Sequence, residues 1–319
     1  MIKRKVIIDC DPGIDDALAI LLALKSNKLD VQGITIVSGN VPACQGAKNV
    51  LKILNLLNRL DIPVYIGEEY PLVRELVTAE DTHGKDGLGE TFLPDISNTN
   101  IFYNAVDFII KTIKKGDKIS IIALGPLTNL AKAIKKDAFT LNKVEEIISM
   151  GGSFKSHGNC SPVAEFNYWV DPHAAKYVYD NINSPITMVN LDVTREIILT
   201  PNYIELLSQF NTSLSKFIVD ITKFYVDFHW RQERTLGCVI NDPLAVAYFI
   251  DNSICSGFYS HIDIVTDGIA MGQSIVDVAN FYGYKSNSYV LNKVDNHKFM
   301  EYFFTCLFPE FKEDINLIL

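Results

Sequence analysis

The feature that most constrains the fold is a regular alternation of short β-branched runs with longer segments of helical periodicity. The predicted strands are Lys5–Asp9, Val31–Val37, Pro63–Ile66, Lys118–Leu124, Glu146–Met150 and Ile186–Leu191. Between them, apolar residues recur at intervals of three and four, as in Ala43–Leu57. This alternation predicts an α/β fold with a mostly parallel, Rossmann-like open sheet flanked by helices on both faces. Ligands are then expected in the loops at the carboxyl ends of the strands.

The same alternation continues from residue 5 to about residue 190 without a Pro/Gly/Ser-rich linker, a low-complexity tract or an internal repeat. We therefore expect residues 1–319 to form a single large domain. From Asn202 to Tyr248 the pattern becomes helical, with an aromatic stripe between Phe217 and Trp230. Core packing is the simplest explanation of that stripe. A second hypothesis is that its polar end, His229 to Arg234, borders a pocket.

Composition excludes several classes of protein. Apolar residues make up 48% of the chain and charged residues 21%, so the chain is expected to fold rather than to remain disordered. The formal charge of −9 argues against nucleic acid as a partner. The longest apolar run, Ala17–Leu24, falls well short of the roughly 20 residues that a membrane-spanning helix needs. Six scattered cysteines without a CxxC pair favour reduced thiols and a cytoplasmic location.

Four carboxylates, those of Asp9, Asp11, Asp15 and Asp16, lie within eight residues between the first predicted strand and an apolar helix. Like charges this close repel one another unless a cation or a proton lies between them. The alternative is that these side chains cap the loop or favour the helix amino terminus through its dipole. All four together, on a turn forced by a Pro-Gly pair, favour a divalent cation. Carboxylate oxygens suit hard ions such as Ca²⁺.

Two later segments carry further polar side chains. Asp242 precedes a proline and the apolar helix Leu244–Ile250, a pattern that alone indicates only a helix start. Glu165 and Asn167 flank Phe166, and both can bind hydroxyl groups, although a surface loop explains them equally well.

Taken together, seven segments resemble the inosine-uridine preferring nucleoside hydrolase family, in an order and spacing that match over nearly the whole chain. They are Asp9 to Asp16, Ser38 to Asn40, Gly125 to Asn129, Met150 to Gly152, Gly158 to Asn159, Ala164 to Asn167 and Asn241 to Pro243. The resemblance implies the nucleoside hydrolase fold and Ca²⁺-dependent hydrolysis of the N-glycosidic bond of ribonucleosides, giving ribose and a free base. It also implies a small-molecule substrate, a role in purine or pyrimidine salvage, and a homodimer or homotetramer.

The resemblance also assigns residues to roles. The implied metal ligands are the side chains of Asp11, Asp16 and Asp242 and the main-chain carbonyl of Leu124. Asp11 is in addition the implied general base that activates a metal-bound water. The implied substrate-binding residues are Asp15, Asn40, Met150, Asn159, Glu165 and Asn167.

The chain departs from the family pattern at Asn241, where members of the inosine-uridine type often carry histidine and purine-preferring members can carry tryptophan. Asparagine donates a hydrogen bond but delivers no proton near neutral pH. We therefore predict that His83, in a glycine-rich loop, or His229 supplies the acid that the leaving base needs. Because of Asn241, the resemblance does not fix the preferred base.

Two alternatives compete with this interpretation. The first is a phosphohydrolase of the haloacid dehalogenase type, in which Asp9 and Asp11 would form a DxD motif around Mg²⁺. The Pro12-Gly13 turn and the late Asp242 argue against it. The second is a ribose- or nucleoside-binding protein that has lost turnover, which Asn241 favours and the intact set of metal-ligating aspartates opposes.

Overall fold

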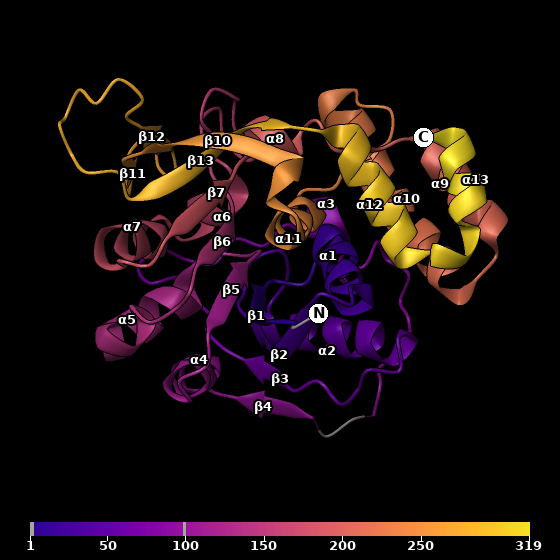
Figure 1. Ribbon diagram of the computed structural model, residues 1–319, viewed down its shortest axis with the longest axis horizontal. Helices are drawn as coiled ribbons and strands as arrows, with labels where there is room; N and C mark the ends of the chain where they lie inside the picture. The colour runs from indigo at the N-terminus through magenta and orange to yellow at the C-terminus, as the bar shows by residue number, and fades with distance from the viewer. Residues whose placement is uncertain (1–2, 98–99) are drawn as a thin grey trace.

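The structure is a computed structural model that describes residues 3–97 and 100–319. Its centre is a nine-stranded sheet in which all neighbouring strands run parallel except β10, which is antiparallel to β13 (Figure 1). In spatial order the strands are β10 (Cys255–Ser260), β13 (Ser288–Val294), β7 (Ile186–Val189), β6 (Ile147–Met150), β5 (Ile119–Ala123), β1 (Arg4–Cys10), β2 (Leu29–Ile36), β3 (Val64–Ile66) and β4 (Ile101–Tyr103). The expectation of a mostly parallel open sheet is confirmed.

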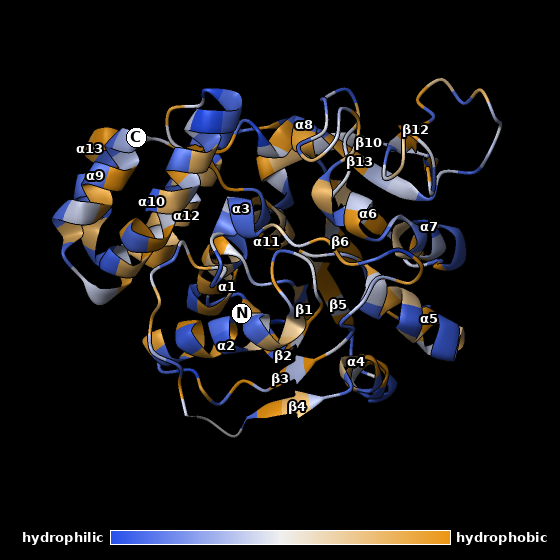
Figure 2. Cartoon of the chain, turned by 180° about the vertical axis from the view of Figure 1, so that it is seen from behind, coloured by the Kyte–Doolittle hydropathy of each residue, from blue (hydrophilic) through white to orange (hydrophobic). Residues whose placement is uncertain are grey.

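Helices cover both faces of this sheet, as the alternation predicted. Successive side chains of β1 point to opposite faces, so Val6 and Ile8 pack in one core cluster and Ile7 in the other. The first cluster includes side chains of α1 (Ile14–Lys25), α2 (Ala43–Leu56), α10 (Ser213–Glu233), α11 (Asp242–Ile250) and α12 (Asn296–Leu307). The second includes side chains of α4 (Ala105–Lys114), α5 (Thr128–Leu141) and α7 (Pro172–Asn181). Figure 2 shows apolar residues along the central strands and hydrophilic residues on the outward sides of these helices.

The edges of the sheet and the carboxyl-terminal third differ most from the prediction. The edge strand β4 was missed because it is three residues long and largely exposed, so it lacks an apolar pattern. The helical stretch from Asn202 to Tyr248 is divided into α9 (Pro201–Phe210), α10 and α11 by β9 (Cys238–Val239), which pairs with β8 (Ile198–Leu199). The remaining elements are α3 (Glu80–His83), α6 (Phe166–Val170), α8 (Leu191–Thr194), β11 (Ile262–Ile264), β12 (Ser274–Val276), α13 (Lys312–Ile318) and two 3₁₀ turns, Asn252–Ile254 and Pro309–Phe311. Among the helices of the described residues, none combines the length and hydropathy that crossing a bilayer requires.

The strand order reverses at β1, and this reversal determines where the loops gather. From β1 the chain adds β2, β3 and β4 on one side, and then β5, β6 and β7 on the other. Loops that leave β1 and β5 therefore diverge, which opens a crevice at the carboxyl ends of the two strands. Asp11 directly follows β1 and Leu124 directly follows β5, and the Leu124 N–H donates to the Asp9 carbonyl at 2.7 Å.

Candidate active site

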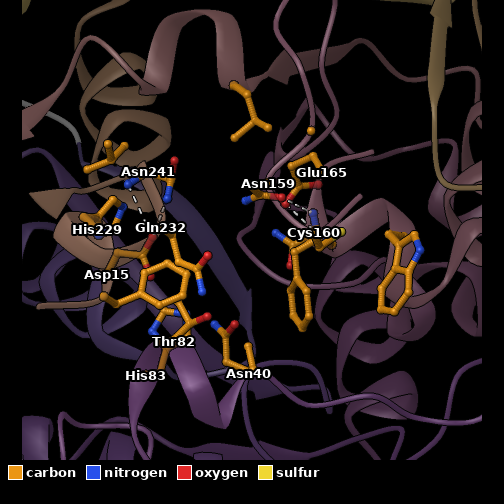
Figure 3. Close-up of a pocket in the computed structure, with 18 of the residues that line it drawn as sticks. Asp15, Asn40, Thr82, His83, Asn159, Cys160, Glu165, His229, Gln232 and Asn241 are labelled. Atoms are coloured by element: carbon orange, nitrogen blue, oxygen red, sulfur yellow. Dashed lines mark hydrogen bonds between the residues drawn. The ribbon is translucent and has the colours of Figure 1, made fainter. Parts of the chain in front are cut away.

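A cavity of about 500 Å³ lies at the carboxyl ends of the strands (Figure 3). Of the residues predicted from the sequence, those that line it are Asp15, Asn40, His83, Leu124, Met150, Asn159, Glu165, Asn167, His229, Asn241 and Asp242. The other two, Asp11 and Asp16, are fully buried beside Asn40. The Asn40 main-chain N–H donates to Asp11 Oδ2 at 2.7 Å, and its side-chain amide donates to Asp16 Oδ2 at 2.9 Å. The structure thus brings all the predicted site residues together.

Carboxylates crowd the floor of this cavity. Carboxylate oxygens of Asp15, Asp16 and Asp242 lie within 4.8 Å of one another. Burial, followed by repulsion from Asp15, raises the pKa of Asp16 to about 7. Burial also raises the pKa of Asp11 and Asp242 well above the ordinary range, with neighbouring carboxylates adding to the effect. A cation at this position would offset both the burial and the repulsion.

The Asp11 side chain has one oxygen that fits such a cation. Asp11 Oδ1 is buried and has no hydrogen-bond partner within residues 3–97 and 100–319. The space next to Asp11 Oδ1 is open because residue 125 is glycine; a Cβ on Gly125 would lie 2.5 Å from this oxygen. Asp11 is not one of the three residues whose oxygens converge, but it is close enough to Asp16 and Asp15 for their charges to act on it. Buried polar atoms are normally paired, so the converging carboxylates together with this unpaired oxygen favour an oxygen-preferring divalent cation. The residues present therefore fit a hard metal ion.

Asp9, the first carboxylate of the acidic run, does not belong to this cluster. Its side chain lies on the same face of the sheet as Ile7, facing α5. Asp9 Oδ1 accepts hydrogen bonds from Thr35 Oγ1 at 2.5 Å and Asn129 Nδ2 at 2.8 Å. Asp9 thus connects β1 to β2 and α5, and burial raises its pKa to about 7.

One wall of the cavity is built around Glu165, which caps the amino terminus of α6. Its carboxylate accepts hydrogen bonds from the main-chain N–H groups of Asn167 (2.8 Å), Gly152 (2.9 Å) and Tyr168 (3.2 Å). Burial raises the pKa of Glu165 to about 7. The side-chain amide of Asn167 donates to the Leu124 carbonyl at 2.6 Å, which places this wall against the acidic floor.

The opposite wall comes from α10 and the start of α11. The side chains of Tyr225, Phe228, His229, Gln232 and Glu233 line it, so the hypothesis that the polar end of the aromatic stripe borders a pocket is confirmed. Asn241 Nδ2 donates to Asp15 Oδ2 at 3.0 Å, and Tyr225 Oη donates to the same oxygen at 3.3 Å. Figure 3 shows His229, Gln232 and Asn241 facing Asn159 and Glu165 across the cavity.

The two histidines differ in which ring nitrogen carries hydrogen. His83 Nδ1 accepts a hydrogen bond from the main-chain N–H of Ile14 at 3.1 Å, so its Nε2 carries the hydrogen. His229 Nδ1 lies 2.9 Å from the Tyr225 carbonyl, which only accepts, so there Nδ1 carries the hydrogen and Nε2 has a lone pair. Burial lowers the pKa of both imidazoles.

Several lining residues were not predicted, among them Trp169, Cys160, His157 and Arg195. Arg195 follows α8, which begins at Leu191, the last residue of the predicted strand Ile186–Leu191. The rule that ligands bind at the carboxyl ends of strands would have directed attention to this segment. For the other three residues the sequence carries no comparable signal.

Comparison with known proteins places the chain in a family. The family model described as inosine-uridine preferring nucleoside hydrolase matches residues 6–301. An uncharacterized protein of Schizosaccharomyces pombe and the pyrimidine-specific ribonucleoside hydrolase RihA of Salmonella typhimurium are each 35% identical to the chain, over 93% of its length and 96% of their own.

Solved structures agree with this match. The purine-preferring ribonucleoside hydrolase from Gardnerella vaginalis superposes with a TM-score of 0.91 at 33% identity, over 97% of this chain and 100% of its own. A plant nucleoside hydrolase superposes with a TM-score of 0.91 at 32% identity, over 96% and 99%. A match over nearly the whole chain rules out the haloacid dehalogenase alternative. The chain therefore belongs to the inosine-uridine preferring nucleoside hydrolase family and is an N-glycosyl hydrolase.

Proposed function

We propose that this hydrolase releases ribose from ribonucleosides with the help of Ca²⁺ held by Asp11, Asp16, Asp242 and the Leu124 carbonyl. The observation that carries the proposal is the convergence of carboxylate oxygens of Asp15, Asp16 and Asp242 within 4.8 Å of one another. The buried Asp11 Oδ1, which has no partner within the described residues, supports it. When bound, the cation supplies positive charge that offsets the carboxylates and makes a nearby water easier to deprotonate. Asp15 joins the same cluster, so we propose that it contacts both the ion and the substrate.

Asp11 is proposed as the general base. Its Oδ2 is fixed by the Asn40 N–H, whereas Oδ1 accepts no hydrogen bond within the described residues. A carboxylate oxygen has more than one lone pair, so Oδ1 could lie against the cation and still take a proton from the attacking water. Glycosidic bonds break through a sugar carbon with cationic character. The neighbouring buried carboxylates are positioned to stabilise that positive charge, and water then completes the substitution.

The ribose is proposed to lie between the acidic floor and the Glu165 wall. The proposed contacts are Asp15, Asn40, Met150, Asn159, Glu165 and Asn167, which all line the cavity. The polar side chains among them are held by hydrogen bonds within the protein before substrate arrives, so a sugar meets polar groups that are already oriented.

Removal of one ribose hydroxyl is expected to be costly. A site built to hydrogen-bond a hydroxyl leaves its own buried polar groups unpaired when the hydroxyl is missing. We expect kcat/KM for 2′-deoxynucleosides to be lower than for the matching ribonucleosides by at least about 100-fold. Initial rates of reducing-sugar release for inosine against 2′-deoxyinosine measure this, and similar values for the two would contradict the proposed ribose contacts.

Of the two histidines, His229 is the better proposed acid for the leaving base. His229 can take up a proton on Nε2 while Nδ1 keeps its hydrogen bond to the Tyr225 carbonyl. Protonation of His83 would instead break the hydrogen bond that Nδ1 accepts from Ile14 and place positive charge at the amino terminus of α1. His83 is therefore proposed to act as a neutral donor through Nε2.

His229→Gln is expected to lower kcat by about 100-fold, because general acid catalysis contributes that much or more. Since burial lowers the pKa of His229, its protonated fraction grows only as pH falls through that lowered value, so kcat should rise toward acid pH in the wild type and lose this rise in the variant. The charged and titratable groups that face the ring are Glu233, Asp15, Arg195 and His83. His83→Gln is the matched comparison, and an acid-side rise that survives in His229→Gln would contradict the assignment.

Three further points are proposals that accompany this function. Residues 1–319 are proposed to form one domain, since the strands of the central sheet come from segments between Arg4 and Val294. A homodimer or homotetramer is proposed from the family resemblance. A cytoplasmic location and a role in nucleoside salvage are proposed as well, and free thiols at the cysteines fit such a reducing compartment.

A panel assay tests the function directly. The protein is incubated with purine and pyrimidine ribonucleosides, because curated relatives are named pyrimidine-specific and a solved relative purine-preferring. Reducing sugar is measured with and without a calcium chelator. We expect ribose release that the chelator abolishes. Binding of nucleosides without release would instead identify a binding protein that has lost turnover.

A further inference from the structure

Two side chains next to β7 hold the loop that carries Asn159 into the cavity. Asp192 lies in α8, and Arg195 directly follows that helix. The Asp192 carboxylate accepts hydrogen bonds from the main-chain N–H groups of Phe154 (2.6 Å), Lys155 (2.7 Å) and Ser156 (3.0 Å). One ionised side chain therefore binds three consecutive donors of the loop 154–158, and hydrogen bonds to a charged acceptor are the stronger kind.

Arg195 binds the next part of the same loop through its acceptors. Its guanidinium donates to the carbonyls of His157 at 2.6 Å and Gly158 at 3.0 Å, and also to the Ser156 hydroxyl. A planar guanidinium presents several N–H groups in a fixed arrangement, which a lysine ammonium does not reproduce. Asp192 and Arg195, here called the loop clamp, thus fix the backbone up to the residue before Asn159.

Arg195 also reaches across to the other wall of the cavity. Its Nη2 lies 3.3 Å from Glu233 Oε1, and Glu233 belongs to α10, the helix that carries His229. Both side chains line the cavity. They are 18% and 29% exposed, so their attraction is only partly screened by solvent. Arg195 therefore connects the wall that holds Asn159 to the wall that holds His229.

We propose that Asp192 and Arg195 are positioning residues that set where Asn159 lies relative to α10, and so determine how tightly the ribose is bound. The proposal rests on the proposed contact between ribose and Asn159. The clamp binds the main chain of the loop and touches no substrate itself, so it acts through Asn159. We expect Asn159 to bind the ribose equally well in the enzyme–substrate complex and in the transition state. Interactions of that kind change KM more than kcat.

Arg195→Lys is the main test, because it keeps the charge and loses the planar donor arrangement. We expect KM for a ribonucleoside to rise by about 10-fold with kcat within about threefold of wild type. The inhibition constant of ribose, added as a product inhibitor, should rise by the same factor as KM. Glu233→Gln removes only the ion pair between Arg195 and Glu233 across the cavity, so we expect KM to rise by about twofold to threefold.

Lys155→Met is the matched control, since it removes one positive charge from the same loop at a side chain whose Nζ lies over the Phe154 ring. KM should stay at the wild-type value in this variant. Hydrogen exchange gives a second measurement: the amides of residues 154–156 should exchange faster in Asp192→Asn than in wild type. An unchanged KM and unchanged ribose inhibition in Arg195→Lys would overturn the proposal, as would an equal rise in Lys155→Met.

This experiment separates the clamp from the function on which it rests. Ribose release by the wild-type protein tests the proposed function alone. Calorimetric affinity for ribose, compared between wild type and Arg195→Lys, tests the clamp without any turnover. An affinity that is equal in the two proteins contradicts the clamp whatever the first result.

Discussion

Replacing Asp11 by asparagine is expected to lower kcat for ribonucleoside hydrolysis by about 10³- to 10⁴-fold. The substitution keeps the size of the side chain and an oxygen that can accept from the Asn40 N–H, but it removes the proposed proton acceptor and one negative charge from the cation site. Steady-state kinetics on inosine and uridine measure the loss. Bound calcium, measured by atomic absorption, distinguishes loss of the base from loss of the metal.

Asp9→Asn is the matched control, because Asp9 is equally buried and lies two positions away in the same acidic run. Its side chain accepts from Thr35 and Asn129 and lies outside the carboxylate cluster, and burial already favours its uncharged form. We expect kcat within about threefold of wild type for this variant. A comparable loss in both variants would mean that the acidic run acts through folding, and the proposal that Asp11 is the general base would be abandoned.

Removal of calcium is expected to abolish activity and to destabilise the fold. A ligand that binds only the native state at 100 times its Kd stabilises it by about 2.7 kcal/mol. For a chain of this size, loss of that stabilisation corresponds to a fall in Tm of roughly 4 to 5 °C. The carboxylates of Asp15, Asp16 and Asp242 would then be buried together without a counter-charge. Thermal unfolding and ribose release are followed after treatment with a chelator and again after Ca²⁺ is added back.

Two comparisons sharpen the calcium experiment. Mg²⁺ should restore less activity than Ca²⁺, because it demands near-ideal octahedral geometry whereas Ca²⁺ accepts an irregular set of oxygens. Asp242→Asn should lower Tm in the presence of Ca²⁺ and lose most of the response to the chelator. If exhaustive chelation left both Tm and activity at their original values, the proposed role of the metal would be wrong.

The sequence predicted the location of the site well because parallel strands bring their carboxyl ends to one edge. Asp11, Asn40, Leu124 and Met150 each end a predicted strand or follow one closely, so their proximity follows from strand direction alone. The missed edge strand β4 has a different cause. β4 is short and exposed, so pairing with β3 rather than its own apolar pattern makes it a strand.

Details that depend on distant partners could not be predicted. The ring hydrogen of His83 is on Nε2 because Nδ1 accepts from the main-chain N–H of Ile14, which lies 69 residues away in the sequence. The clamp formed by Asp192 and Arg195 recognises main-chain atoms, which have no signature in the sequence. Alternation along a strand would place Asp9 and Asp11 on one face, because they are two positions apart. They separate because β1 ends at Cys10, so that Asp11 turns to accept from the Asn40 N–H while Asp9 accepts from Thr35 and Asn129.

The reversal of strand order at β1 has a consequence for how the protein is made. The acidic loop emerges early from the ribosome, but Asn241, which donates to Asp15, is 226 residues further along the chain. At synthesis rates of 5 to 20 residues per second, the loop waits roughly 11 to 45 s for α11 to arrive. Until then the nascent chain lacks Asp242 and the packing that shields the loop from water. We therefore expect capture of the cation to be a late step of folding, which follows synthesis of the chain through α11.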